Sequence, residues 1–208
     1  MVFQYPGPLY RIIFENMKLL NSNEKNGFSV VENLSRLSSG SVLLSRDQLL
    51  DPNFEATVVL LCAYSAEGTY GLVLNRPSHM PLSEIFDGLG GLDIKREIYI
   101  GGPVAQEELQ ILQITSEPAE QSFQLAPQVY AGGKWDDLSQ MIESDPEYTR
   151  LFLGYSGWSP GQLETEIEAG AWDVYRVDLK RLLLDIDRTI SVPVKRLSDY
   201  LSQLSEQG

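Results

Sequence analysis

Ser159 is the residue whose surroundings most resemble a catalytic motif. It lies in Gly157-Trp158-Ser159-Pro160-Gly161, which matches the G-x-S-x-G pattern of a hydrolase nucleophile elbow and falls between a predicted strand and a predicted helix. Two features oppose that role. The residue after the serine is a proline, which has no backbone N–H to line an oxyanion hole. The sole histidine, His79, precedes the serine, whereas the base of such enzymes follows it.

The same residues also fit the start of a helix. Ser159 would be the N-cap, Pro160 the first helical residue and Gln162 the third, which is a capping box of the S-x-x-Q type. Glu164 would then lie in the first turn, near the positive end of the helix dipole. We therefore expect a helix cap at Ser159 and name no catalytic residue, with a hydrolase or acyl-transfer enzyme using Ser159 or Cys62 as the alternative.

Cys62 is the second candidate nucleophile, and His79 is its candidate base. A hairpin that turns near Glu67 puts Cys62 opposite Leu72, and His79 lies about 23 Å farther along at about 3.3 Å per residue. Only a sharp return after Pro77 would bring them together. Free cysteine is also among the most buried residue types. We expect Cys62 in the core and His79 on the surface.

Metal and phosphate sites receive little support from the sequence. Asp136-Asp137 and Asp185-Ile186-Asp187 carry oxygen ligands for a hard cation, but the 29 acidic residues produce such pairs by chance. Two glycine-rich turns, at residues 88–91 and 101–102, lack the spacing of a P-loop or a dinucleotide motif. One cysteine rules out a disulfide framework and a cysteine-based zinc site. We predict no metal and no cofactor.

Composition limits the class of partner. The chain has 208 residues, with 16 Lys and Arg against 29 Asp and Glu, for a net charge of −13. Clustered cations are what bind nucleic-acid phosphates, so we expect no direct nucleic-acid partner. No apolar run reaches the roughly 20 residues of a membrane span, and residues 1–26 lack the pattern of a secretory signal. We expect a soluble, cytoplasmic protein that does not enter a membrane, and its oligomeric state stays open.

Hydrophobic patterning predicts the elements that must position these residues. Residues 1–26 read as an extension, with a short helix possible over Leu9–Leu20, and residues 27–208 as one domain. The interleaved order, without a βαβ period, predicts an α/β sandwich: a mixed, largely antiparallel sheet with helices packed on it. The expected strands cover 40–45, 57–64, 70–75, 97–100, 109–114, 123–125, 150–155 and 173–178, and the expected helices 81–86, 136–143, 162–171 and 194–204.

Four segments carry a resemblance to a known family. They are Asp51-Pro52-Asn53-Phe54 with the apolar run after it, Gly71-Leu72-Val73-Leu74-Asn75-Arg76-Pro77, Gly101-Gly102-Pro103-Val104, and Gly154-Tyr155-Ser156-Gly157-Trp158 with Gly161-Gln162-Leu163-Glu164. In this order and spacing, from about Ser38 to Trp172, they resemble the AlgH/YqgE family of bacterial proteins. The resemblance implies an α/β sandwich with a shallow apolar cleft framed by these motifs. It implies no settled reaction, and the family name is associated with regulation of alginate production.

Polar and aromatic residues at strand ends are how a binding cleft is usually built. We therefore expect a binding or regulatory protein whose partner is another protein or a small ligand. Arg76 would hold a carboxylate or phosphate. The alternative is that Asn75 caps a turn, that Arg76 pairs with Asp51 or Glu164, and that Trp158 fills the core. The candidate binding residues are Asn75, Arg76, Pro77, Gly101, Gly102, Pro103, Tyr155, Ser156 and Trp158.

Overall fold

The computed structural model describes residues 27–46, 54–79, 97–144, 148–193 and 196–205. Three predicted features lie outside these ranges: the N-terminal extension with its helix over Leu9–Leu20, the helix over Pro81–Phe86, and the glycine-rich turn at 88–91. Within them, no helix has both the length and the apolar character that crossing a bilayer requires.

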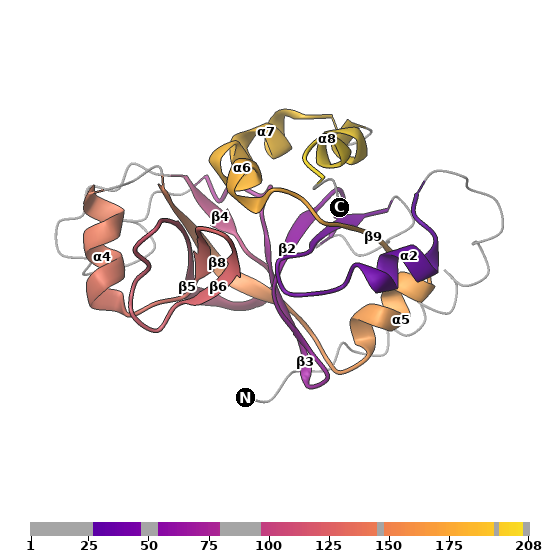
Figure 1. Cartoon of the computed structure of the whole chain (residues 1–208), viewed down its shortest axis with the longest axis horizontal. Coiled ribbons are helices and arrows are strands. Elements are labelled where there is room, and N and C mark those ends of the chain that lie inside the picture. Colours follow the sequence, from indigo (N-terminus) through magenta and orange to yellow (C-terminus); the bar gives the residue numbers. More distant parts are fainter. Residues whose placement is uncertain (1–26, 47–53, 80–96, 145–147, 194–195, 206–208) are drawn as a thin grey trace.

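The described strands form one twisted, nine-stranded sheet (Figure 1). They are β1 (Val42–Ser45), β2 (Val58–Ser65), β3 (Gly68–Val73), β4 (Ile98–Ile100), β5 (Val104–Ile114), β6 (Phe123–Ala126), β7 (Val129–Ala131), β8 (Thr149–Trp158) and β9 (Trp172–Tyr175). Their order is β6-β7-β5-β8-β3-β2-β1-β9, and β4 pairs with β8 off this path. The β4–β8 pair is parallel and the others are antiparallel, so the predicted mixed, largely antiparallel sheet is confirmed.

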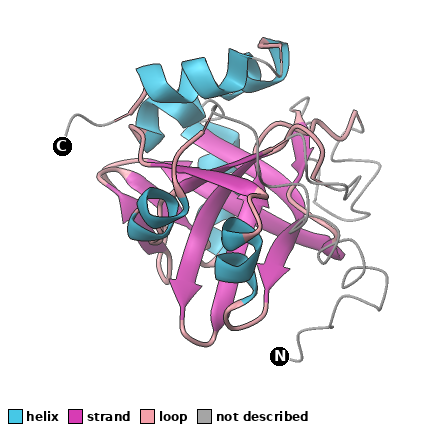
Figure 2. Ribbon diagram, turned by 90° about the vertical axis from the view of Figure 1, so that its right-hand side faces the viewer, coloured by secondary structure: helices cyan, strands magenta, loops and turns pink. Residues whose placement is uncertain are grey.

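Helices cover the sheet on both faces, as expected of an α/β sandwich. The described helices are α2 (Val30–Ser35), α4 (Trp135–Ser144), α5 (Gln162–Glu168), α6 (Leu179–Leu184), α7 (Ile186–Ser191) and α8 (Leu197–Gln203). Figure 1 shows α6, α7 and α8 together above the sheet, α2 beside α5 at one end, and α4 at the other end. Figure 2 shows the twist of the strands, with helices lying above them. The predicted α/β fold is confirmed.

The hairpin of β2 and β3 lies near the centre of the sheet. Its strand from Val58 to Cys62 is buried, because both faces of the sheet are covered here. Leu60 pairs with Leu72, and the register then shifts between Leu61 and Ala63. Cys62 therefore lies in a bulge and not opposite Leu72, so the predicted register is wrong by two residues. The bulge takes up one residue that a regular ladder would have paired.

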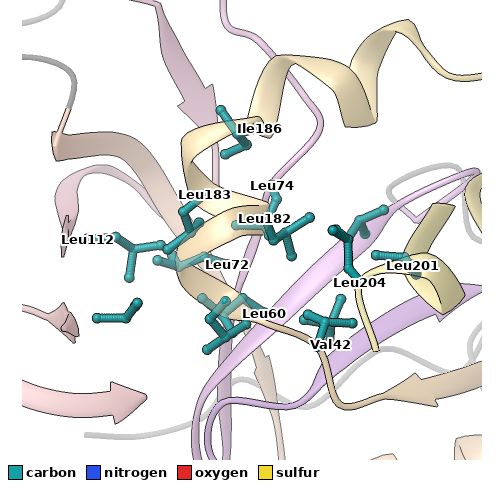
Figure 3. Close-up of a cluster of buried hydrophobic side chains, with 14 of the residues drawn as sticks. Val42, Leu60, Leu72, Leu74, Leu112, Leu182, Leu183, Ile186, Leu201 and Leu204 are labelled. Atoms are coloured by element: carbon teal, nitrogen blue, oxygen red, sulfur yellow. The ribbon is translucent and has the colours of Figure 1, made fainter. Parts of the chain in front are cut away.

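Alternate residues of the central strands build the core under α6, α7 and α8 (Figure 3). Val42, Leu60 and Leu72, from three neighbouring strands, belong to the same buried cluster as Leu182 and Leu201 of the helices. Fully burying one such aliphatic side chain contributes about 1.5–3 kcal/mol. This cluster therefore holds the helical layer on the sheet.

The intervening residues face the opposite side and form two smaller cores. Under α5, Val59 packs in one cluster with Trp158 of β8 and Trp172 of β9. Under α4, Ile142 packs in another cluster with Leu151 and other residues of β4, β5 and β8. The period of two along β1, β2 and β3 thus separates the layers, as the strand pattern requires.

The faces of β8 exchange at Gly154. Before it, Phe152 belongs to the core under α6, α7 and α8, whereas Trp158 after it belongs to the core under α5. Residues an even number apart lie on the same face of a regular strand. Because Phe152 and Trp158 lie on opposite faces, β8 must contain one irregular residue between them. Gly154 has a φ of 64°, in the left-handed region, and residues 105–108 of β5 form an irregular stretch opposite it. A glycine meets that conformation without strain.

The edge strand β9 is closed by α2 and the chain before it. Asn33 accepts the Val174 backbone N–H at 2.7 Å through Oδ1. Asp173 accepts the Phe28 backbone N–H at 3.0 Å and also forms an ion pair with Arg46. These bonds satisfy groups that an open sheet edge would offer to another chain.

Several element predictions need correction. The helix expected over 162–171 ends at Glu168, and the strand expected over 173–178 is β9, which ends at Tyr175. The sequence reasoning did not predict β7, α2, α6 or α7. The start of α6 carried a signal, because Asp178 is its N-cap and accepts the Arg181 backbone N–H at 3.0 Å. The amphipathic helix expected at the C-terminal end is confirmed as α8, which buries Leu197 and Leu201.

Candidate functional site

Three of the four motif segments meet where β3 and β4 both run beside β8. The Gly101 N–H donates to Leu153 O at 2.7 Å, and Gly101 O accepts the Val73 N–H at 2.9 Å. Ile100 N–H donates to Arg76 O at 2.7 Å, so the chain after β3 also pairs with β4. The structure therefore brings residues 75–77, 101–103 and 155–158 to one junction of the sheet.

The glycines of the motifs permit backbones to touch at this junction. A Cβ at Gly101 would overlap Gly154 O, and a Cβ at Gly102 would overlap the backbone of Tyr155. A Cβ at Gly154 would lie 2.7 Å from Val104 O. Real Cβ atoms do not approach so closely, so these positions require glycine for packing alone. The spacing of these glycines in the sequence therefore reflects backbone packing at the junction.

The polar side chains of the motifs bond to the backbone of the same junction. Asn75 accepts the Val58 N–H at 2.9 Å and donates to Ala56 O at 2.8 Å, and so continues the ladder of β2 past the end of β3. Ser156 donates to Gly101 O at 3.2 Å. Arg76 Nη2 donates to Glu55 O at 3.2 Å. Asn75 thus extends a strand where the sequence suggested a turn cap.

Partners of Arg76 and Pro77 can be placed only in part. Asp51, one acid suggested for Arg76, lies outside the described residues. The other, Glu164, accepts a hydrogen bond from the Tyr64 hydroxyl at 2.6 Å. Pro77 forms an isolated bridge with Tyr99.

Trp158 fills the core, as the alternative interpretation expected. It is 2% exposed, and Phe54 stacks on it with ring centroids 6.2 Å apart. Its indole N–H donates to Glu166 Oε2 at 2.9 Å. Trp172 donates to the same oxygen at 2.8 Å. Trp158 therefore stabilises the junction from inside and offers no surface to a ligand.

The two candidate nucleophiles lie in unsuitable surroundings. Cys62 is 1% exposed, and burial raises the pKa of its thiol far above the ordinary value, which disfavours the reactive thiolate. His79 is exposed, as expected. Ser159 precedes the helix but does not cap it, since α5 begins after Gly161, which has a φ of 73° and is the N-cap residue.

The capping-box prediction is therefore half right. Gln162 does reach back and accept the Ser159 backbone N–H at 3.0 Å. Pro160 and Gly161 form a turn before the helix, so neither the cap at Ser159 nor the first helical position at Pro160 is correct. The predicted start is two residues too early, because Gly161 supplies the left-handed conformation that ends the turn before the helix.

Acidic residues do not gather into a metal site in the part of the chain described here. That part holds no group of three or more His, Cys, Asp or Glu side chains able to share an ion. Asp187 accepts the Tyr99 hydroxyl at 2.6 Å, and Asp185 pairs with Arg188 at 3.5 Å. Asp137 accepts the Glu120 backbone N–H at 2.9 Å.

Tyr155 is the motif residue whose aromatic side chain is only partly buried, at the margin of the core under α6, α7 and α8. Its ring lies 5.1 Å from that of Tyr70, at an angle of 51°, and the Tyr70 hydroxyl donates to Gln110 Oε1 at 2.8 Å. Val104 pairs with Tyr155 and is 37% exposed. Cross-strand pairs share a face, so Tyr70, Val104, Gln110 and Tyr155 form one continuous surface, here named the tyrosine face.

A sequence model of a known family covers most of this architecture. The model, described as AlgH-like, matches residues 42–194. The chain belongs to the AlgH-like family. The resemblance seen in the four motifs is thereby confirmed, and all nine candidate site residues lie inside the matched range.

Relatives of known sequence and structure agree with the AlgH-like assignment. A UPF0301 protein of Chlorobium limicola is 34% identical over 161 residues, covering 76% of this chain and 84% of the relative. A UPF0301 protein of Chlorobaculum tepidum is 36% identical over 139 residues, covering 65% and 73%. The solution structure of the AlgH protein of Pseudomonas aeruginosa matches with a TM-score of 0.65 and 27% identity, covering 89% of this chain and 94% of that one. A crystal structure from Corynebacterium diphtheriae shares the fold, with a TM-score of 0.56 and 24% identity over 76% and 80% of the two chains.

Three members of the tyrosine face of this AlgH-like chain were not among the candidate binding residues: Tyr70, Val104 and Gln110. The alternation of Tyr70 with Leu72 placed both on one side of β3. That pattern could not reveal where the cover of α6, α7 and α8 stops. Leu72 is buried beneath the helices, while Tyr70 is only partly buried.

Proposed function

We propose that this AlgH-like protein is a binding module that docks a cationic segment of a partner protein on its tyrosine face. The observation that carries the proposal is a set of partly exposed tyrosine and valine side chains on a rigid sheet junction, with carboxylates beside them. The other polar atoms of the motifs are engaged inside the junction. Contact with a partner would therefore fall to Tyr70, Val104, Gln110 and Tyr155.

Charge favours a cationic partner. Glu107 and Glu108 are exposed in the irregular stretch of β5 between Val104 and Gln110. Burial is the main cause that raises the pKa of Tyr70, and the Glu108 charge adds a smaller effect in the same direction, so Glu108 acts at this face. The whole chain carries −13. The negative electrostatic field of these charges speeds the approach of a positively charged segment and repels acidic segments.

The paired rings of Tyr70 and Tyr155 can bind a partner with little loss of side-chain conformational entropy. Tyr70 and Tyr155 contact each other, and the Tyr70 hydroxyl is held by Gln110, so the rings lose little freedom when a partner binds. The flat side of a tyrosine ring attracts the side chains of Lys and Arg by cation–π interaction, worth about 0.5–2 kcal/mol each. An extended segment with Lys or Arg between apolar residues has the matching chemistry.

Titration of the isotope-labelled full chain tests this function. The probe is a short peptide of Lys, Pro and Leu, and its control is the same peptide with Glu in place of Lys. We expect saturable amide shifts at Tyr70, Val104 and Tyr155 with the basic peptide alone, and weaker binding at higher salt. Equal binding of the acidic peptide, or shifts confined to another surface, would reject the proposal.

Charge-reversed variants sharpen the test. Glu108→Lys should weaken binding of the basic peptide by about tenfold or more. Glu117→Lys is the matched control, because Glu117 is exposed and lies beyond the end of β5. A loss of equal size in the control would show that only the net charge matters. No observation favours the hydrolase alternative over this function.

A further inference from the structure

A surface cavity lies away from the tyrosine face, at the other end of β5. It has a volume of about 240 Å³ and is lined by Ile114, Thr115, Ser116, Gln128, Tyr148 and Lys180. These residues come from the end of β5, the turn between β6 and β7, the start of β8 and the start of α6. The volume is below the roughly 300–1,000 Å³ of pockets that hold drug-sized ligands. It admits a small polar group but no large ligand.

The lining is cationic in a strongly acidic chain. Lys180 supplies an ammonium group, and none of the six lining residues carries a carboxylate. Asp178, the nearest acid before Lys180 in the sequence, accepts the Arg181 backbone N–H at 3.0 Å as the cap of α6. The net charge of the whole chain is −13, so a cavity with a cation and no acid in its lining is a local exception.

The cation is held in place across the cavity. Lys180 Nζ donates to Gln128 Oε1 at 2.6 Å, which leaves two of its three N–H donors for other partners. Gln128 has a φ of 63°, a left-handed conformation that is uncommon for this residue type. Its carbonyl accepts the Thr115 N–H at 2.9 Å, which fixes the turn against the end of β5.

Two hydroxyl groups complete the set of donors. Ser116 and Tyr148 line the cavity, and neither hydroxyl bonds to another residue in the part of the chain that the structure describes. Thr115 is different, because its hydroxyl donates to Glu117 O at 3.3 Å and accepts the Glu117 N–H at 3.0 Å. One ammonium and two hydroxyl donors therefore surround the cavity.

We propose that this cavity binds the phosphate group of a small molecule, with Lys180 as its counter-charge and the Ser116 and Tyr148 hydroxyls as additional donors. A phosphate group presents three terminal oxygens, and the lining offers a donor for each. Lys is a common phosphate ligand as a point charge. The site is independent of the tyrosine face and of any partner bound there. It requires no reaction, and it gives the protein a second ligand class.

The first test is titration of the isotope-labelled full chain with inorganic phosphate and with phenyl phosphate. We expect saturable amide shifts at Thr115, Ser116, Gln128 and Lys180 with both probes. Tighter binding of phenyl phosphate would point to a phosphate ester as the source, and equal binding to free phosphate. Succinate is the control anion, and binding of succinate as tight as that of phosphate would overturn the assignment to phosphate.

Variants separate this site from general attraction to lysine. Lys180→Gln should weaken phosphate binding about tenfold or more, because a charge-assisted bond is lost. Tyr148→Phe should weaken it less, since it removes one neutral donor. Lys134→Gln is the control, because Lys134 is an exposed lysine that pairs with Glu120 at 3.8 Å and does not line the cavity. Unchanged binding in Lys180→Gln, or an equal loss in Lys134→Gln, would refute the proposal.

Discussion

Trp158 and Trp172 donate their indole N–H groups to one carboxylate oxygen, Oε2 of Glu166, at 2.9 and 2.8 Å. Glu166 is 1% exposed, and its other oxygen accepts the Gln162 amide at 3.0 Å. The carboxylate thus ties β8, α5 and β9 together inside a core that is otherwise apolar. Buried polar groups are tolerated when all of them are bonded, and they become costly when one partner is removed.

Replacing Glu166 should therefore destabilise the fold far more than its size suggests. Glu166→Ala leaves two buried indole donors without an acceptor, at about 1–3 kcal/mol for each. Glu166→Gln keeps an acceptor oxygen and should lose less. Glu168→Ala, in the same helix but exposed, is the control. The free energy of unfolding in urea measures all three, and equal stability of Glu166→Ala and the parent chain would contradict the role assigned here.

Alanine at Gly102 should disrupt the sheet junction. Its Cβ would overlap the backbone of Tyr155, so we expect a loss of about 3 kcal/mol or more, or failure to fold. Gly161→Ala is the matched control: its φ is 73° but no atom lies within 4 Å of the added Cβ. Strain alone should cost it about 1 kcal/mol. Thermal unfolding compares the two variants, and a similar loss in both would mean that conformation and not close contact matters.

Alkaline pH should destabilise the protein through Tyr64. A hydrogen bond to Glu164, together with burial and the Glu164 charge, raises the pKa of Tyr64 from its ordinary value near 10 to about 12. The unfolded chain then releases this proton at lower pH than the folded chain does. Stability is therefore fully present below about pH 10 and falls as the pH rises toward about 12.

The measurement is the free energy of unfolding across that range for the parent chain and for Tyr64→Phe. The variant removes the titrating hydroxyl and should show a shallower fall. Tyr70 and Tyr99 also have raised pKa values, chiefly through burial, so part of the fall should remain. An identical pH profile in the two proteins would show that the bond to Glu164 has no effect on the titration.

Cys62 should be inert to thiol reagents while the protein is folded. Its thiol lies in the bulge of β2, buried, with a raised pKa caused by burial. Because the thiolate is the reacting form, we expect labelling at least about a hundredfold slower than in the chain unfolded by denaturant. Fast labelling of the folded protein would restore the thiol alternative that the sequence left open.

Most of the fold could be predicted from the sequence, whereas the candidate site could be predicted only in part. The apolar run of β2 and its turn into β3 were clear because β-branched residues and a turn signal coincide there. The short helices α6 and α7 were missed because six residues give too little periodicity for recognition. The edge strand β9 was predicted to extend to residue 178, but it ends at Tyr175 because its partner β1 begins opposite it at Val42.

The motif residues show why the sequence alone could not identify the binding surface. Asn75 and Ser156 have the chemistry of ligands, yet each bonds to backbone across the junction. Only the three-dimensional pairing reveals those partners. Tyr155 was identified with them but Tyr70, its neighbour in space, was not, because their contact depends on the register between β3 and β8.

The position of β8 has a consequence for synthesis of the chain. β8 pairs with β3, β4 and β5, and so joins the two halves of the sheet. None of those pairings can form before β8 has left the ribosome, and the pairing with β3 needs residues 156–158 at its end. At about 5–20 residues per second, the apolar β2–β3 hairpin must wait several seconds for its neighbour. During that interval the edge of β3 that will pair with β8 is open to other chains, so nascent protein should depend on chaperones more than its finished form does.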